Sequence, residues 1–214
     1  MRADLHDEFA AVSSSLVTMA KAVREAMRQA GVALLTADPT LATQVTLRDA
    51  EIDVLHRVVD DRVYELVALR RPVDTDLRMA LTAFQVAADL DRMGDLAVHI
   101  ARATLRRYPA AAAAAELTHL FRSMTTVADE LSGKLVTALS DRDAKLAAQL
   151  DGDDDAMDRL HHELFAAMLR PDWPLGVEAA VDGALLGRYF ERYADHAVNI
   201  GRHVVFLSTG TMTG

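Results

Sequence analysis

The stretch Tyr189–Arg202, with the sequence YFERYADHAVNIGR, decides how the rest of this chain is interpreted, because the chain contains it twice. The earlier copy, Asp89–Arg102, has the sequence DLDRMGDLAVHIAR and aligns with the later one without a gap, at an offset of 100 residues. Apolar residues recur in both copies at steps of three and four, which is typical of one face of an amphipathic helix. The sequence therefore predicts two related helices, each with acidic residues four positions apart.

A second repeat lies before each of these two helices, at an offset of 105 residues. Its matching residues are Asp38 and Asp143, Asp49 and Asp154, Asp53 and Asp158, and His56 and His161. A further apolar helical pattern precedes each segment, so that each half of the chain contains three helices. Several of these helices are about 30 residues long, which suits an elongated bundle. The predicted fold is all-α, with six long helices in two tandem, pseudo-symmetric three-helix units.

Proline and turn residues mark the expected boundaries. Tyr108-Pro109 closes the first half, because proline cannot donate a hydrogen bond inside a helix, and the six alanines that follow suit either a linker or a helix start. Ser140 or Asp141 is expected to restart the chain within the second half, and Trp173-Pro174 to open the last helix. We place the first repeat at residues 1–108, a linker at 109–116 and the second repeat at 117–214.

Composition excludes several classes of protein. The 214 residues include no cysteine, so neither a disulfide framework nor a thiolate zinc site is possible. The net charge of −9 argues against a nucleic-acid partner, whose phosphates attract basic surfaces. The N-terminus does not resemble a signal peptide, and no apolar run approaches the roughly 20 residues that span a bilayer. We expect a soluble cytoplasmic protein.

The acidic residues of the repeated helices lie on the side opposite their apolar residues. At about 100° per residue, Glu191 and Asp195 form one row that faces away from Tyr193. Most such rows are solvated helix faces, but two carboxylates four positions apart repel each other, and no Lys or Arg continues this row. A bound cation would explain why both halves keep the row, and oxygen ligands with at most one His or Asn suit Mg²⁺, Mn²⁺, Ca²⁺ or iron. The candidate ligands are Glu191, Asp195, Asn199, Asp91, Asp95, His99, Asp154, Asp158, Asp49 and Asp53.

The doubled motif resembles that of the PhoU family, and the resemblance covers essentially the whole chain. It rests on ERYAD at 191–195 with Asn199, on DRMGD at 91–95 with His99, and on the aspartate pairs Asp49–Asp53 and Asp154–Asp158. The first copy departs from the family pattern, because Asp91 replaces the usual glutamate and His99 stands where asparagine is common. The first site is therefore expected to differ in geometry or metal preference.

The resemblance implies two three-helix bundles packed side by side, a homodimer, and carboxylate-bound metal ions in some members. It implies a negative regulator of the phosphate-starvation response that contacts a sensor histidine kinase and the ATPase of the phosphate transporter. The membrane is then reached only through these partners. The expected role is non-enzymatic, with a divalent or trivalent ion such as iron, Mn or Mg as the cofactor.

Two other functions fit part of the pattern. Asp53-x-x-His56 and Asp158-x-x-His161 resemble the Glu-x-x-His spacing of di-metal carboxylate enzymes, although the acids here are aspartates. A helical adaptor that needs no metal is the other alternative. The histidines outside the rows, such as His196 and His203, are expected to be exposed or to cap helices. No nucleotide-binding loop of the Gly-x-x-x-x-Gly-Lys type is present.

Overall fold

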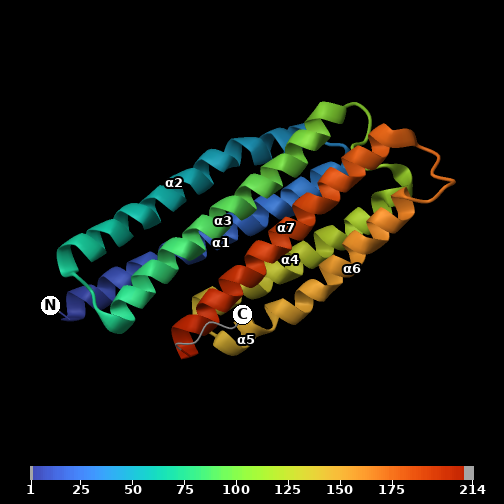
Figure 1. The fold of residues 1–214 in the computed structure, drawn as a ribbon. Helices are drawn as coiled ribbons and strands as arrows, with labels where there is room; N and C mark the ends of the chain where they lie inside the picture. The colour runs from blue at the N-terminus through green and yellow to red at the C-terminus, as the bar shows by residue number, and fades with distance from the viewer. Residues whose placement is uncertain (1, 210–214) are drawn as a thin grey trace.

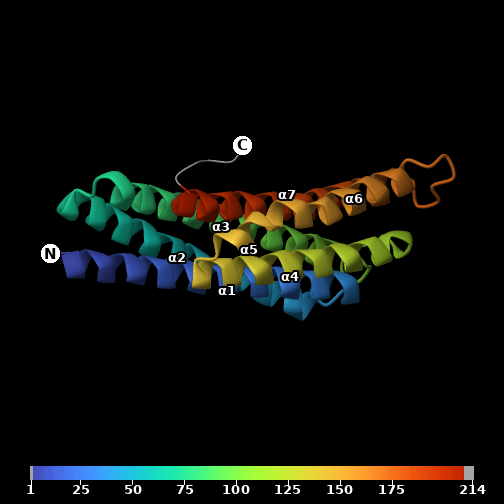
Figure 2. The same cartoon turned by 90° about the horizontal axis from the view of Figure 1, so that it is seen from below.

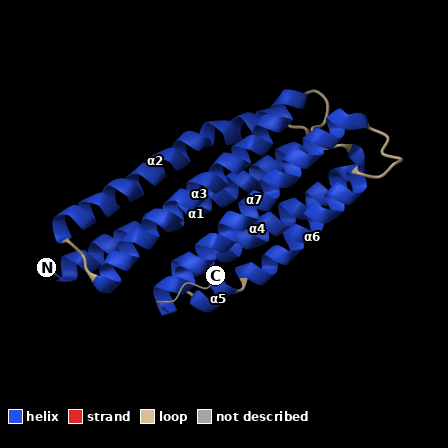
Figure 3. Cartoon of the chain, in the orientation of Figure 1, coloured by secondary structure: helices blue, strands red, loops and turns tan. Residues whose placement is uncertain are grey.

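The computed structural model describes residues 2–209, with side chains from residue 7 onward. Met1 and residues 210–214, which complete the two expected repeats, lie outside the described part. The helices are α1 (Arg2–Thr36), α2 (Pro39–Arg70), α3 (Asp74–Arg107), the short 3₁₀ helix η1 (Ala115–Leu117), α4 (Thr118–Asp141), α5 (Ala144–Ala148), α6 (Leu150–Met168) and α7 (Gly176–Thr209). Residues 2–209 contain no strand, which confirms the all-α prediction (Figure 3).

Four long helices form the centre of the elongated molecule. Helix α1 packs against α3 and α4, and α7 packs against α3 and α4. Helix α2 covers α1 and α3 on one side, and α6 covers α4 and α7 on the other (Figures 1 and 2). One continuous cluster of buried apolar side chains includes residues of both halves, among them Met19 of α1, Phe121 of α4 and Phe190 of α7. The two halves therefore share a core across their seam.

The same turn joins the first two helices of each half. Ala37 and Arg142 both adopt a left-handed backbone, with φ of 51° and 53°, and each is followed by an aspartate that caps the next helix. Asp38 accepts hydrogen bonds from two backbone N–H groups at 2.8 and 3.1 Å, and Asp143 does so at 2.9 and 3.0 Å. An aspartate at this position satisfies N–H groups that lack partners within the helix. The offset of 105 residues is therefore visible in the backbone.

The second half differs from the expected helix boundaries in three places. Helix α4 continues through Asp141, and Asp143 rather than Ser140 or Asp141 starts the next helix, because Arg142 takes the left-handed turn. The single helix expected after this turn is interrupted at Gln149, which separates α5 from α6. The last helix begins at Gly176 and not at Trp173-Pro174: the Trp173 indole N–H donates to the Gly176 carbonyl at 2.8 Å, and Gly176 has a φ of 74°. These two features hold residues 173–176 as a turn.

The alanine run between the halves is not a continuation of helix. Residues 109–114 are irregular, and η1 leads into α4. Ala112 and Ala113 are nevertheless buried against the shared core. Small side chains let this segment lie close to the helices, so it crosses the seam as a packed connection.

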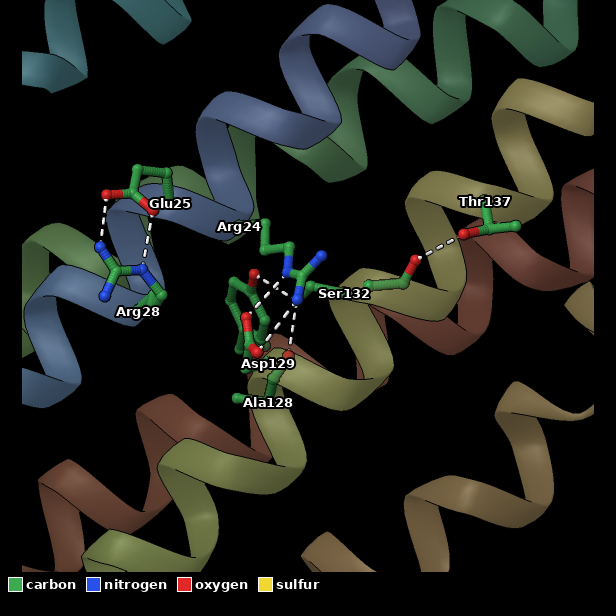
Figure 4. Close-up of polar contacts among 9 residues, drawn as sticks. Arg24, Glu25, Arg28, Ala128, Asp129, Ser132 and Thr137 are labelled. Atoms are coloured by element: carbon green, nitrogen blue, oxygen red, sulfur yellow. Dashed lines mark hydrogen bonds and ion pairs between the residues drawn. The ribbon is translucent and has the colours of Figure 1, made fainter.

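Helices α1 and α4 approach each other closely at the seam. A methyl group at Gly31 would lie 2.4 Å from a side-chain carbon of Thr125, so only glycine fits there without rearrangement. The Arg24 guanidinium binds both carboxylate oxygens of Asp129 at 2.7 and 3.0 Å (Figure 4). This ion pair raises the pKa of Arg24 and lowers that of Asp129. A paired charge and a close contact thus join the two halves.

Candidate functional site

The structure places four carboxylates of the second half on two adjacent helices. Asp154 and Asp158 lie on α6, and Glu191 and Asp195 lie on the adjacent α7; we call these four residues the second acidic cluster. Burial raises the pKa of Asp154 to about 7, and the negative charges of Asp158, Asp195 and Glu191 contribute to the increase. Burial and Asp195 also raise the pKa of Glu191. Such increases mean that the four groups repel each other when all are ionised.

The first half contains the equivalent arrangement. Asp49 and Asp53 on α2 and Asp91 and Asp95 on α3 form what we call the first acidic cluster. Burial is the largest cause of the raised pKa of Asp49, and the negative charges of Asp53 and Asp95 raise it further. The positive charge of Arg102 opposes the increase. The pseudo-symmetry of the fold therefore places two groups of four acids, each on a pair of neighbouring helices.

Arginines compensate part of the acidic rows. Arg92 donates to Asp95 at 2.9 Å, and Arg192 donates to Asp195 at 3.1 Å. Arg188 forms an ion pair with Glu191. The expectation that the rows lack a positive partner is therefore wrong, because a long arginine side chain three positions away reaches the carboxylate from the side of the row. The Arg92 and Arg192 pairs are largely exposed and contribute about 0–1 kcal/mol each, whereas Glu191 in the third pair is mostly buried.

A histidine borders each cluster. His56 Nδ1 lies 3.2 Å from an Asp91 oxygen, and His56 Nε2 lies 3.6 Å from an oxygen of Asp60. In the second half, burial lowers the pKa of His161 and favours its neutral form. Its Nε2 atom is buried and has no hydrogen-bond partner in the described part of the chain. Gly187 permits this packing, because a methyl group there would lie 3.3 Å from the His161 ring and 2.3 Å from Leu164.

The donor chemistry of both clusters fits a hard or borderline metal ion. Carboxylate oxygens with one neutral imidazole are suitable ligands for Mg²⁺, Mn²⁺ or iron. In the second cluster, burial and the neighbouring carboxylates raise the pKa of Asp154, and the buried Nε2 atom of His161 has no hydrogen-bond partner in the described part of the chain. Among residues 2–209, no three His, Asp or Glu side chains are already grouped as a metal site would require. Any metal ion held here would require rotation of the carboxylate side chains.

Asn199 and His99, the other two candidate ligands, contact the opposite long helix. Asn199 of α7 donates to Asp89 of α3 at 2.6 Å. His99 of α3 stacks on Tyr189 of α7, with ring centroids 5.1 Å apart. These contacts are equivalent under the pseudo-symmetry, because Asp89 corresponds to Tyr189 and His99 to Asn199. The structure thus places both residues at the interface between α3 and α7, and their metal-binding role stays a prediction.

The sequence pattern does not predict the cluster of polar side chains around Asp89. His196 Nδ1 lies 2.9 Å from one Asp89 oxygen, and His203 Nε2 lies 3.8 Å from the other. The expectation of exposed or capping histidines is wrong for His203, which is buried and whose pKa is lowered by burial. The spacing of 196, 199 and 203 places all three on one helical face, and this signal was available. Asp89 is the one aspartate that α3 contributes to this cluster, so no repeated spacing in the sequence connects it with these three residues.

Comparisons with known proteins agree with the doubled fold. The family model described as the PhoU domain matches twice, over residues 16–104 and 121–204. Two curated proteins of Mycobacterium tuberculosis, phosphate-specific transport system accessory protein PhoU homologs 2 and 1, are each 41% identical to the chain. The alignment with homolog 2 covers 98% of this chain and 99% of the relative, and that with homolog 1 covers 99% and 96%.

A solved structure shares the fold over nearly its full length. The crystal structure of PhoU from Pseudomonas aeruginosa superposes with a TM-score of 0.85 at 27% identity, covering 96% of this chain and 99% of that one. The helices of residues 2–209 include none that is long and apolar enough to cross a bilayer.

Proposed function

Because the chain belongs to the PhoU family, we propose that it regulates phosphate uptake and represses the phosphate-starvation response. The observation that carries this proposal is the match of the family model to both halves, together with an acidic cluster in each half. The related proteins are named as accessory proteins of a phosphate-specific transport system, and the proposed role is non-enzymatic.

The proposed partners are a sensor histidine kinase and the ATPase of the phosphate transporter. A regulator of this kind acts in the cytoplasm and reaches the membrane only through these proteins. We further propose a homodimer, in which two copies display four acidic clusters. The acidic composition, with a net charge of −9, is consistent with protein partners and unfavourable for nucleic acid.

The acidic clusters are the proposed metal sites. Asp154, Asp158, Glu191 and Asp195 would hold the ion in the second half, and Asp49, Asp53, Asp91 and Asp95 in the first. A bound ion would supply positive charge that cancels the repulsion among the carboxylates. The chain's own contribution is to hold these groups on neighbouring rigid helices, so that their charge state affects the surface that a partner meets. His56, 3.2 Å from Asp91, and His161, whose pKa is lowered by burial, border the proposed sites.

A reporter of phosphate-regulated transcription tests the regulatory role. Deleting the gene should activate the reporter in phosphate-rich medium, and a plasmid copy should restore repression. Equal reporter activity with and without the gene, in both rich and starved cells, would refute the proposal.

Elemental analysis of the purified protein tests the metal sites. The double variant Glu191→Ala/Asp195→Ala should contain less iron or manganese than the unmodified protein, and Asp155→Ala, an exposed acid on the same helix as Asp154, should match the unmodified protein. Equal metal content in all three proteins would exclude the second cluster and favour an adaptor that needs no metal.

A further inference from the structure

Large apolar side chains are exposed at the tip of the hairpin formed by α2 and α3. Tyr64 and Leu69 of α2, Val73 of the turn, and Leu77 and Leu81 of α3 are each between 37% and 78% exposed. The rings of Tyr64 on α2 and Phe84 on α3 pack edge to face, with their centroids 5.9 Å apart, so the two helices contribute to one surface. We call Tyr64, Val73, Leu77 and Leu81 the first hairpin patch; Leu69 lies about 140° from Tyr64 around α2, on the side that faces α1. Monomeric proteins seldom expose several neighbouring large apolar residues without a binding role.

The hairpin formed by α6 and α7 carries a matching surface. Phe165 and Leu169 of α6 and Val177, Val181 and Leu185 of α7 are between 37% and 80% exposed, and we call them the second hairpin patch. The α7 residues Val177 and Val181 occupy the positions equivalent to Leu77 and Leu81. Figure 1 shows the two hairpin tips at opposite ends of the molecule. Repetition of the exposed residues in both halves indicates a shared role rather than an accident of one surface.

Each patch continues into an acidic cluster along one helix face. Leu77 and Asp95 are 18 residues apart, which is five helical turns and about 27 Å, so they lie on the same side of α3. Val177 and Asp195 have the same separation on α7. Each hairpin therefore presents an apolar surface at its tip and an acidic cluster about three to five turns further along, in which arginines compensate part of the negative charge.

Charge decides between the possible occupants of this surface. A membrane is disfavoured, because anionic lipid headgroups would repel the acidic half. Contact with the same surface of a second copy is disfavoured, because it would bring two acidic clusters together. A helix with an apolar stripe at one end and Lys or Arg at the other complements both halves at once.

We propose that each hairpin is a docking surface for a basic amphipathic helix of a partner protein, so that one chain binds two such helices. The apolar end of the helix covers the hairpin patch, and its cations lie over the acidic cluster in the metal-free state of the protein. The identity of the partner as a component of phosphate signalling rests on the proposed function. The docking surface itself can fail or succeed independently of that role, because it is tested with purified protein.

The test is calorimetric titration of the full chain with a synthetic helix-forming peptide of roughly 20 residues, long enough to span the surface. Its leucines recur at helical spacing over the first two turns, and its lysines over the last two. A chelator in the buffer keeps the carboxylates free of metal. We expect two peptides per chain, and binding that weakens with added salt. The double variant Leu81→Gln/Val181→Gln should bind about five- to tenfold more weakly, since half-burying each side chain contributes about 1 kcal/mol.

Leu47→Gln is the matched control, because Leu47 is an exposed leucine of α2 that lies outside both patches. It should bind like the unmodified protein, and a scrambled peptide of the same composition should bind no variant tightly. One peptide or fewer per chain, equal affinity for the double variant, or equal binding of the scrambled peptide would overturn the proposal. Sedimentation of the double variant as a monomer, where the unmodified chain is a dimer, would instead assign the patches to a second copy.

Discussion

Replacing Asp154 with asparagine should stabilise the metal-free protein at neutral and alkaline pH. Burial raises the pKa of this carboxyl group to about 7, and the charges of Asp158, Asp195 and Glu191 add to the effect. In an unfolded chain the pKa of an aspartate side chain is about 3.9. The folded protein thus binds this proton more tightly than the unfolded chain does, so that its stability falls as pH rises from about 4 to about 7.

The size of this effect follows from the difference in pKa. Complete conversion of the shift into free energy gives an upper limit of about 4 kcal/mol. Asp154 is only partly buried, and solvent screening reduces the expected gain for Asp154→Asn to about 1–2 kcal/mol. Asparagine has nearly the same size and cannot ionise. Its advantage should therefore be small near pH 4, grow as pH rises, and become constant above about pH 7.

Urea unfolding of both proteins over this pH range, with a chelator present, measures the difference directly. Asp155→Asn is the matched control, because Asp155 is the exposed neighbour of Asp154 on α6. An advantage that does not depend on pH, or a variant that is less stable than the unmodified protein at pH 8, would refute the repulsion inferred for the second acidic cluster.

Three further substitutions test the local structure. Asp143→Ala removes the N-cap of α5 and should lower the free energy of unfolding by about 1 kcal/mol in urea titrations; an unchanged value would show that this cap is dispensable. Arg142→Gly relieves a left-handed backbone and should raise the melting temperature through about 1 kcal/mol of added stability, and a lower melting temperature would contradict this. Tyr193→Phe removes the buried 2.7 Å hydrogen bond to Ser132 and should cost about 1 kcal/mol in urea titrations, whereas no loss would mean that the hydroxyl contributes nothing.

The repeat made most of the fold predictable. Offsets of 100 and 105 residues identify equivalent helices. The restart is expected at Ser140 or Asp141, although the match of Asp143 with Asp38 marks the N-cap that the structure shows. The sequence did not reveal the interruption at Gln149, because no proline or glycine marks it. It also could not distinguish a linker from a helix in the alanine run, since alanine has the highest helix propensity while its small size also suits a packed connection.

Helical geometry predicts which residues of the candidate site share a helix face, but not which residues of other helices they contact. Periodicity placed Glu191 and Asp195 in one row, and the repeat paired that row with Asp154 and Asp158. Which neighbour each side chain contacts depends on the packing of α3 against α7, which no spacing rule gives. For this reason helical spacing places Asn199 in the acidic row, whereas its hydrogen bond in the structure is to Asp89 on α3.

The most direct test of the proposed function is complementation of a gene-deletion strain that carries a phosphate-responsive reporter. We predict that the unmodified gene restores repression in phosphate-rich medium. We predict that Glu191→Ala/Asp195→Ala does not, although the variant is folded and present at equal abundance. Full repression by this variant would contradict a regulatory role for the second acidic cluster.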